Sequence, residues 1–308
     1  MTASAAESSA YLRAAIFAPA THRAYNNSFQ SFLHFSGLQA SRLRLMRPQR
    51  IDQLLCRFIG ELHHTGRPHS TAVHALSGLV HYLPRLRQQL PEARLRIRGW
   101  ARRKVTTSHP PITWELTLVI ALTMAQFGHH AEAIACLLSF DCYLRVGEMT
   151  RLRFKDIIIP HDARMGKAHI GMALRLPKTK TGLNQWVSLH NDRVSSLLFS
   201  WFKLRRRAGA RSHDKVFPFS PDHFRHLLRR VADSVGLGST AYVPHSFRHG
   251  GATTDNLLGH SIEQIMFRGR WRSMDSARRY IQTGRALLAA QRVPRRVHRQ
   301  VSCMTLAS

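Results

Sequence analysis

The sequence predicts a mainly α-helical protein that also contains a small three-stranded antiparallel sheet, an α+β fold. Apolar residues recur at helical spacing along most of the chain, whereas three short runs of β-branched or alternating residues lie together within residues 157–189. At 308 residues the chain is long enough for two domains. Apolar periodicity stops at residues 105–112, which end in Pro-Pro-Ile, so we expect this segment to be a linker.

The first domain is predicted to be a helical unit over residues 21–104, behind a flexible N-terminus at residues 1–20. Amphipathic helices are expected within residues 25–37, 51–62 and 73–83. A further stretch, residues 94–104, carries six basic residues and almost no acidic partner. We expect this stretch to contact phosphates; a solvated helix face is the alternative.

The second domain is predicted to span residues 113–292 and to contain the sheet. Its strands are expected at residues 157–159, 169–176 and 185–189. Its helices are expected at residues 113–125, 130–140, 191–207, 221–235, 261–268, 273–280 and 285–292, with another around residues 245–248. Residues 293–308 are expected to form an unstructured basic tail.

Basic residues dominate the composition. The sequence holds 46 Lys and Arg against 17 Asp and Glu, a formal net charge of +29. Such a chain needs a polyanion, and we expect double-stranded DNA ahead of RNA or an anionic membrane surface. The predicted DNA contacts are Arg98, Arg102, Arg103, Lys104 and Lys178. No run of about 18 apolar residues is present, so no transmembrane helix is expected.

The cysteines and histidines predict neither a disulfide framework nor a metal site. The four cysteines are scattered without a Cys-x-x-Cys pair, which is typical of a reducing compartment. That compartment would be the nucleus in a eukaryotic host and otherwise the cytoplasm or nucleoid. Two pairs of adjacent histidines, at residues 63–64 and 129–130, invite a metal interpretation. Because adjacent side chains point apart and no carboxylate cluster accompanies them, we expect no metal and no cofactor.

Five residues have the chemistry that phosphoryl transfer to a protein hydroxyl needs. In chain order they are Arg145, His245, Arg248, Trp271 and Tyr280. Planar arginine forks match the non-bridging oxygens of a phosphodiester, and a tyrosine hydroxyl can attack phosphorus. Each residue alone is ordinary, as a surface charge or a packed aromatic. The occurrence of all five residues in this order is not ordinary.

This ordered set resembles the motifs of the tyrosine recombinases, the phage-integrase-type site-specific recombinases. The matching pieces are Arg145-x-x-Glu148, His245-x-x-Arg248, and a Gly-Arg-Trp271 triplet whose tryptophan lies nine residues before Tyr280. The resemblance covers residues 113–290. It implies a core-binding domain at residues 21–104 that clamps DNA, and a catalytic domain at residues 113–292.

The resemblance implies DNA cleavage and rejoining through a 3′-phosphotyrosine intermediate, without metal or ATP. Tyr280 would be the nucleophile, and Arg145 and Arg248 would bind the non-bridging oxygens. His245 and Trp271 would complete the cradle, with His245 also the candidate for moving the tyrosine proton. Recombination or integration of DNA would follow.

Two supporting roles are expected around this set. Glu148 is expected to orient Arg145 or a neighbouring base; a simple helical ion pair is the alternative. In the family a lysine on a β-hairpin protonates the departing 5′ oxygen. Lys180 matches that position better than Lys178, although the same loop contains both.

Other functions and the mode of assembly stay open. A type IB topoisomerase-like activity and a DNA-binding protein that has lost catalysis are the alternatives to recombination. The resemblance implies a monomer that becomes a homotetramer on two paired DNA sites. The apolar segment 285–292 would then dock on a neighbouring protomer, after a Thr-Gly pair that can break a helix; folding back onto its own domain is the alternative.

Overall fold

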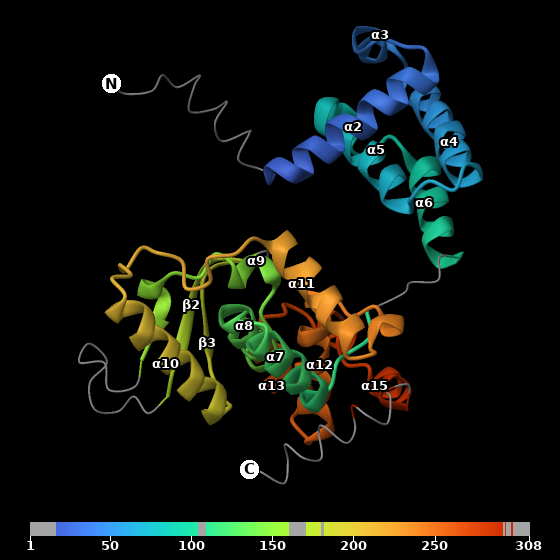
Figure 1. Ribbon diagram of the computed structural model, residues 1–308. Coiled ribbons are helices and arrows are strands. Elements are labelled where there is room, and N and C mark those ends of the chain that lie inside the picture. The colour runs from blue at the N-terminus through green and yellow to red at the C-terminus, as the bar shows by residue number, and fades with distance from the viewer. Residues whose placement is uncertain are drawn as a thin grey trace, which may run out of the picture. The chain divides into compact units, whose positions relative to one another are not determined.

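The computed structural model describes residues 17–103, 109–159, 171–179 and 182–291, with residues 293 and 297. The chain divides into two compact units between residues 107 and 108, inside the segment predicted to be a linker. Helices dominate and the strands form a single three-stranded sheet in the described part of the chain, so the predicted α+β class is confirmed (Figure 1). The functional assignment of the two units stays a prediction.

The N-terminal unit is a bundle of helices around one apolar core. Its α-helices are α2 (Pro19–Ser36), α3 (Ala40–Leu45), α4 (Pro48–His64), α5 (His69–Tyr82) and α6 (Pro91–Arg103). Helix α2 ends at Gly37, whose φ of 65° few other residues tolerate. Asp52 of α4 accepts hydrogen bonds from the backbone N–H groups of Glu92 and Ala93, and so fixes the start of α6. Fully buried Phe32 and Leu55 lie in this core.

Two features of this unit differ from the expectations. Helix α6 starts three residues earlier than residue 94, because the carboxylate that caps its first turn comes from another helix, where local sequence gives no signal. The short helix α3 was not predicted. It has six residues and buries one side chain, Leu43, which is too little for a periodic pattern.

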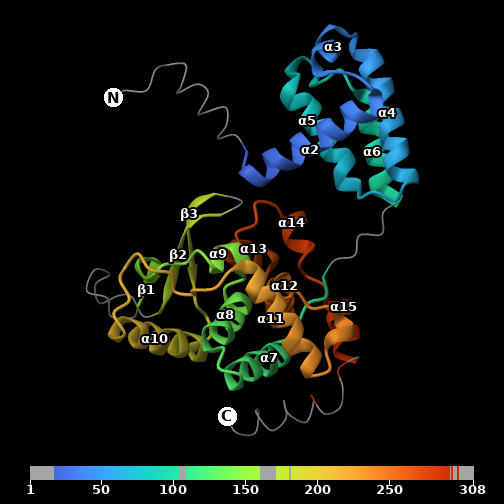
Figure 2. The ribbon, with the colours of Figure 1, turned by 45° about the horizontal axis from the view of Figure 1, so that its top comes forward.

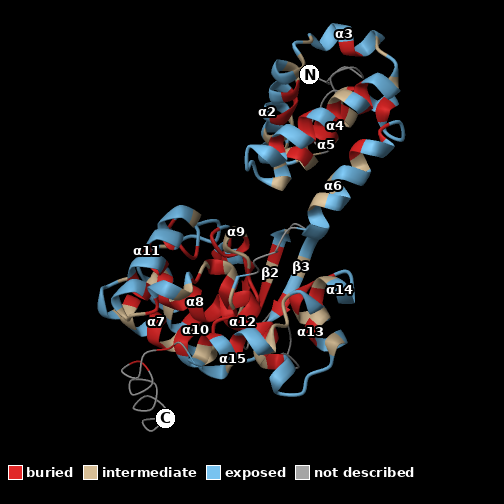
Figure 3. Ribbon diagram, turned by 90° about the vertical axis from the view of Figure 1, so that its right-hand side faces the viewer, coloured by how far each residue is buried: buried red, intermediate tan, exposed pale blue. Residues whose placement is uncertain are grey.

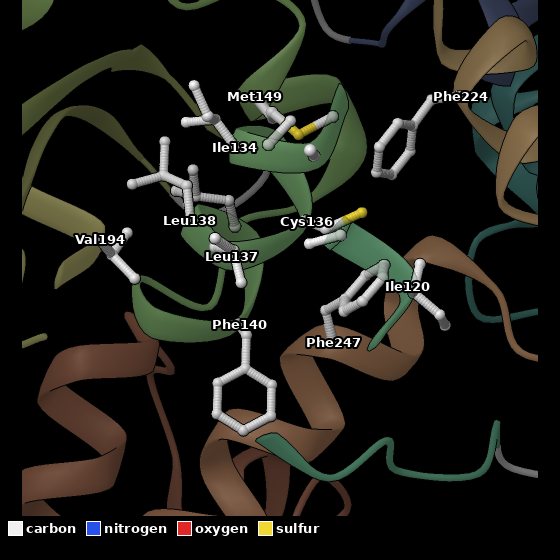
Figure 4. Close-up of a cluster of buried hydrophobic side chains, with 14 of the residues drawn as sticks. Ile120, Ile134, Cys136, Leu137, Leu138, Phe140, Met149, Val194, Phe224 and Phe247 are labelled. Carbon is white, nitrogen blue, oxygen red and sulfur yellow. The ribbon is translucent and has the colours of Figure 1, made fainter. Parts of the chain in front are cut away.

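The C-terminal unit is built around one buried helix. Its α-helices are α7 (Trp114–Gln126), α8 (His130–Asp141), α9 (Val146–Met149), α10 (Asp192–Arg207), α11 (Pro221–Ser234), α12 (Pro244–Leu257), α13 (Ile262–Gly269), α14 (Met274–Arg278) and α15 (Thr283–Gln291). Helix α8 packs against α7, α10 and α12 (Figures 2 and 3). Figure 4 shows Leu137 and Phe140 of α8 near Ile120 of α7 and Phe247 of α12. Burying each such side chain stabilises the fold by about 1.5–3 kcal/mol.

The sheet lies beside this helical core. Strands β1 (Ile157–Ile158), β2 (Ala173–Lys178) and β3 (Leu183–Ser188) pair antiparallel in the order β1-β2-β3. Leu174 pairs with Val187 and Lys178 with Leu183 in the β2–β3 register. Strand β2 therefore includes Lys178, which was expected in the loop, because the ladder continues beyond residue 176. The predicted start of this strand at residue 169 lies outside the described residues.

The end of the C-terminal unit, from α14 onward, departs from the expectations in three ways. Helix α14 ends at Arg278, so Tyr280 follows the helix instead of ending it. Helix α15 begins at Thr283, so the Thr-Gly pair that was expected to precede this helix forms its first two residues. Within the predicted unstructured tail, Val293 and Val297 are buried in the core of the C-terminal unit. Among the described helices, none has the length and apolar character needed to cross a membrane.

Candidate active site

The five predicted residues come from four segments that meet beside α12. Arg145 is the N-cap of α9, and Trp271 and Tyr280 follow α13 and α14. Helix α12 begins at Pro244, a residue suited to the first helical position, so His245 and Arg248 lie in its first turns. A Cβ on residue 251 would overlap the Phe140 carbonyl oxygen and the Tyr143 ring. Gly251 thus lets α12 pack close to the end of α8.

The side chain of Tyr280 is held on three sides. His245 Nε2 lies 3.0 Å from the Tyr280 hydroxyl oxygen. The Tyr280 ring stacks on His249, with centroids 4.5 Å apart and planes 24° apart, and its centroid lies 4.6 Å from that of Trp271. Thr253 Oγ1 donates to the Tyr280 carbonyl oxygen at 3.2 Å. The hydroxyl is therefore oriented although the residue stands outside regular structure.

Arg248 lies under these rings and is fully buried. Its guanidinium donates to the carbonyl oxygens of Tyr143 and Gly269. The guanidinium carbon lies 4.5 Å from the centroid of Trp271 and 5.2 Å from that of Tyr280. Burial, together with the nearby Arg145 and Arg270 charges, lowers the pKa of Arg248 to about 9. Arg248 is still a cation at neutral pH, and a bound anion would relieve the repulsion.

A buried carboxylate joins two more arginines to the site. Glu148 Oε1 accepts from Arg145 Nη1 at 2.6 Å, and its Oε2 accepts from the Arg145 backbone N–H at 3.0 Å. Arg270 Nη2 lies 3.1 Å from the same Oε2. Burial alone would raise the pKa of Glu148, but Arg270 and Arg145 hold it below its usual range. Glu148 therefore stays ionised and sets the orientation of both guanidinium groups.

The two histidines of the site are neutral at physiological pH. Burial, with the charges of His249 and Arg248, lowers the pKa of His245 to about 3. Burial likewise lowers the pKa of His249 to about 4. A neutral imidazole can accept a proton, and His245 Nε2 lies within hydrogen-bonding distance of the Tyr280 hydroxyl group, which carries one. The geometry thus combines a hydroxyl, a base and a cationic cradle.

The similarities of this chain to known proteins lie in its fold. No protein-family model matches the sequence, and no curated protein does. A lambda integrase dimer bound to a COC′ core site aligns with a TM-score of 0.60 at 14% identity, over 89% of this chain and 92% of that chain. XerH recombinase in a post-cleavage complex with palindromic difH aligns with a TM-score of 0.57 at 14% identity, over 82% and 75%. The Tn1549 transposon integrase with transposon right end DNA aligns with a TM-score of 0.53 at 14% identity, over 87% and 98%. The chain has the tyrosine-recombinase fold.

The comparison also gives the extent of the match. A longer chain of lambda integrase is covered over 65% of its length. The predicted resemblance is confirmed at the level of the fold of these recombinases and integrases. The roles of individual side chains rest on the geometry above.

The predicted DNA contacts of this tyrosine-recombinase fold lie in both units. Arg98, Arg102 and Arg103 are exposed on α6. Lys104 and Lys180 lie outside the described residues. Lys178 is exposed at the end of β2 and lines a cleft of about 500 Å³. Other basic residues lining this cleft are Arg151, Arg153, Lys155, Arg175 and Lys215, and Glu148 lines it too. The cleft therefore connects the active-site carboxylate with a cationic surface.

Sequence reasoning missed three residues that build the site. Arg270 was treated as the middle residue of a Gly-Arg-Trp triplet, yet it is buried and contacts Glu148. His249 stacks on the Tyr280 ring. Arg268 bridges the buried carboxylates of Asp141 and Asp255 and packs on the ring of Tyr143. For the two arginines the sequence offers one signal, which is that the chain has only 17 acidic residues. Any acidic residue that is buried needs a basic partner, so each one points to an arginine or lysine that lies near it in the fold.

Proposed function

We propose that this protein cleaves and rejoins DNA strands through a 3′-phosphotyrosine intermediate at Tyr280, in site-specific recombination or integration. The observation that carries the proposal is the 3.0 Å separation of His245 Nε2 and the Tyr280 hydroxyl, beside the buried Arg248. A nucleophile, its proton acceptor and a fixed cation in one place are what attack on a phosphodiester requires. The lambda integrase, XerH and Tn1549 structures of the same fold contain DNA.

The chemistry balances with residues of this chain. Tyr280 Oη forms a bond to phosphorus while the phosphorus–O5′ bond breaks, and His245 Nε2 takes the phenolic proton. Arg145 and Arg248 bind the non-bridging oxygens, whose developing charge they offset. Lys180 supplies a proton to the departing 5′ oxygen; Lys178 is the second candidate. The phosphotyrosine conserves the bond, so a 5′-hydroxyl of another strand can reverse the reaction without ATP.

The remaining predicted residues hold this arrangement. Glu148 positions Arg145 and Arg270 through both carboxylate oxygens. Trp271 packs against the Tyr280 ring and against the guanidinium of Arg248. Because Arg145 and Arg248 supply positive charge at the phosphate, the reaction is expected to need no metal ion.

Double-stranded DNA is the proposed partner, with a free monomer and a homotetramer on two paired sites. The +29 net charge supports the DNA part of this proposal. Leu287 and Leu288 support assembly, because they are 60% and 57% exposed on α15 while Ala286 and Ala289 of the same helix are buried. An apolar pair turned to solvent on a packed helix is a surface that a neighbouring protomer can cover.

A nicked suicide substrate tests the proposal. The wild-type protein should form a covalent adduct with DNA, and Tyr280→Phe should bind the same DNA with unchanged affinity but form no adduct. Tyr82→Phe in the N-terminal unit is the control and should behave as the wild type. An adduct that persists in Tyr280→Phe would remove this residue from the role.

The same proteins separate the alternative functions. A recombinase should join two paired sites and require both, whereas a type IB topoisomerase-like enzyme would relax a supercoiled plasmid that carries no paired site. A wild-type protein that binds DNA yet yields no adduct on any nicked substrate would be a DNA-binding protein without catalysis.

A further inference from the structure

Three metal-ligating side chains meet at the surface of the C-terminal unit, on elements that hold none of the proposed catalytic residues. His129 is the N-cap of α8, Glu132 lies in its first turn, and His223 lies in the first turn of α11. One ligand atom of each lies within 4.8 Å of the other two. His129 belongs to one of the histidine pairs that invite a metal interpretation, but His223 is 91 residues from Glu132, so only the fold brings the three side chains together.

The carboxylate in this group is buried among partners that carry no fixed charge. The side chain of Glu132 is 10% exposed, and its ion-pair partners within the described residues are His223 and His129. The chain has 46 lysines and arginines, yet none of those described forms an ion pair with Glu132. The buried carboxylate therefore faces two imidazoles and no lysine or arginine of the described residues.

The spacing of the ligand atoms suits a transition-metal ion. His223 Nε2 lies 2.8 Å from Glu132 Oε1, and His129 Nδ1 lies 3.9 Å from the same oxygen. Ligand atoms around a tetrahedral zinc ion lie roughly 3.3 Å apart, given bonds of about 2.0–2.1 Å. The imidazoles, 34% and 46% exposed, can turn to that separation while the buried carboxylate stays fixed. Two imidazoles and one carboxylate favour Zn²⁺ over Mg²⁺ or Ca²⁺.

We propose that His129, Glu132 and His223 form a structural binding site for Zn²⁺, with solvent completing its coordination. The ion neutralises Glu132 and ties the start of α8 to the start of α11. These helices lead to, or pack against, the elements that carry the active site, since α8 precedes Arg145 and α11 contacts α12. The site acts on stability and not on the chemistry at Tyr280.

The test uses the full chain after removal of metal by a chelator. Zinc added at about 100 times its dissociation constant should raise the unfolding temperature of the C-terminal unit by roughly 5–10 °C. Co²⁺ added in its place should give visible absorption bands typical of nitrogen and oxygen ligands at low coordination number. The variant His223→Ala, which changes an exposed side chain, should lose both effects, and Glu132→Gln should lose the cobalt spectrum.

The matched control is His130→Ala, which removes an exposed histidine next to His129 that is not one of the three ligands. It should keep the full temperature shift and the spectrum. An equal shift in the wild type and in His223→Ala would overturn the proposal, because zinc would then bind elsewhere on this histidine-rich chain. A wild-type protein without shift or spectrum would overturn it too, and would leave the direct contact of His223 with Glu132 as the interaction that joins the two helices.

Discussion

His245 Nε2 lies 3.0 Å from the hydroxyl oxygen of Tyr280, although 35 residues separate the two along the chain. The contact depends on α12, because the same helix supplies His249 beneath the Tyr280 ring and Thr253 to its carbonyl oxygen. One helix thus provides the base and also holds the nucleophile against it. The hydroxyl is oriented before any substrate binds, which removes part of the entropic cost of reaching the reactive geometry.

Replacing His245 tests whether this contact moves a proton. His245→Gln keeps a side chain of similar length but removes the proton acceptor, so the rate of adduct formation should fall about 100-fold or more. Affinity for DNA should stay within a few fold of the wild type. His226→Gln, an exposed change on α11, serves as the control, and an unchanged rate in His245→Gln would assign the proton to another base.

Breaking the Glu148 ion pairs should cost both stability and activity. Glu148→Gln leaves the buried Arg270 without its carboxylate, and loss of one partner of a buried pair costs about 3–5 kcal/mol of unfolding free energy. Adduct formation should fall as well, because Arg145 loses its orientation. The control is Asp222→Asn, which breaks the exposed Arg225–Asp222 pair and should cost less than about 1 kcal/mol. Equal costs in urea denaturation would contradict this account.

The pH dependence of stability should report the two neutral histidines. The pKa values of His245 and His249 in the folded protein are about 3 and about 4, below the value near 6.5 of an unfolded chain. The unfolded state then binds more protons between these values, so stability is complete above about pH 6.5 and is lost as the pH falls toward 4. Each histidine contributes a slope of up to about 1.4 kcal/mol per pH unit in that window.

Thermal unfolding of the wild type and of His249→Gln between pH 4 and pH 7 measures this effect. The variant should unfold at a temperature that depends less on pH, because one of the two groups no longer titrates. His226→Gln should keep the wild-type slope. A variant slope equal to that of the wild type would mean that other groups dominate acid unfolding.

The sequence predicted the fold class and the main helices because their apolar faces repeat locally. Helix α4 and helix α5 each end near a signal that can be read from the chain, such as the proline that follows α5. The start of α6 could not be predicted in the same way, since Asp52 caps it from another helix. Apolar periodicity predicts that a helix is present, but it does not predict which distant side chain determines the residue at which the helix begins.

In the candidate site, too, the sequence predicted some residues and missed those that depend on distant contacts. Ordered motifs predicted which residues gather, since their spacing follows from chemistry that needs all of them. They did not predict Arg270 or His249, whose contacts with Glu148 and Tyr280 exist only after α12 and α13 have packed. Buried charge pairs of this kind have no local pattern, because either partner can come from any position in the chain.

Removal of divalent metal should separate chemistry from stability. Cleavage of a nicked substrate should survive excess EDTA at 25 °C, because Arg145 and Arg248 supply the positive charge at the phosphate. The unfolding temperature should fall under the same treatment if zinc was bound at His129, Glu132 and His223. Loss of cleavage at 25 °C, where the protein stays folded, with recovery on adding Mg²⁺, would overturn the proposed mechanism.

Assembly on paired sites should depend on the exposed leucines of α15. Truncation at residue 285 is a poor test, because Ala286, Ala289 and Val297 are buried and their loss would disturb the fold. The double substitution of Leu287 and Leu288 by Ser changes only exposed side chains, so the unfolding temperature should stay near that of the wild type.

This leucine variant should bind a single half-site normally but lose cooperative binding to two paired half-sites, because the apolar surface offered to a neighbouring protomer is gone. The matched control replaces Leu257 and Leu258, an equally exposed pair at the end of α12, and should keep cooperativity. Gel-shift titrations over both substrates measure the difference. If the Leu287 and Leu288 variant still binds paired half-sites cooperatively, α15 does not contribute to assembly, and a monomeric topoisomerase-like function gains support.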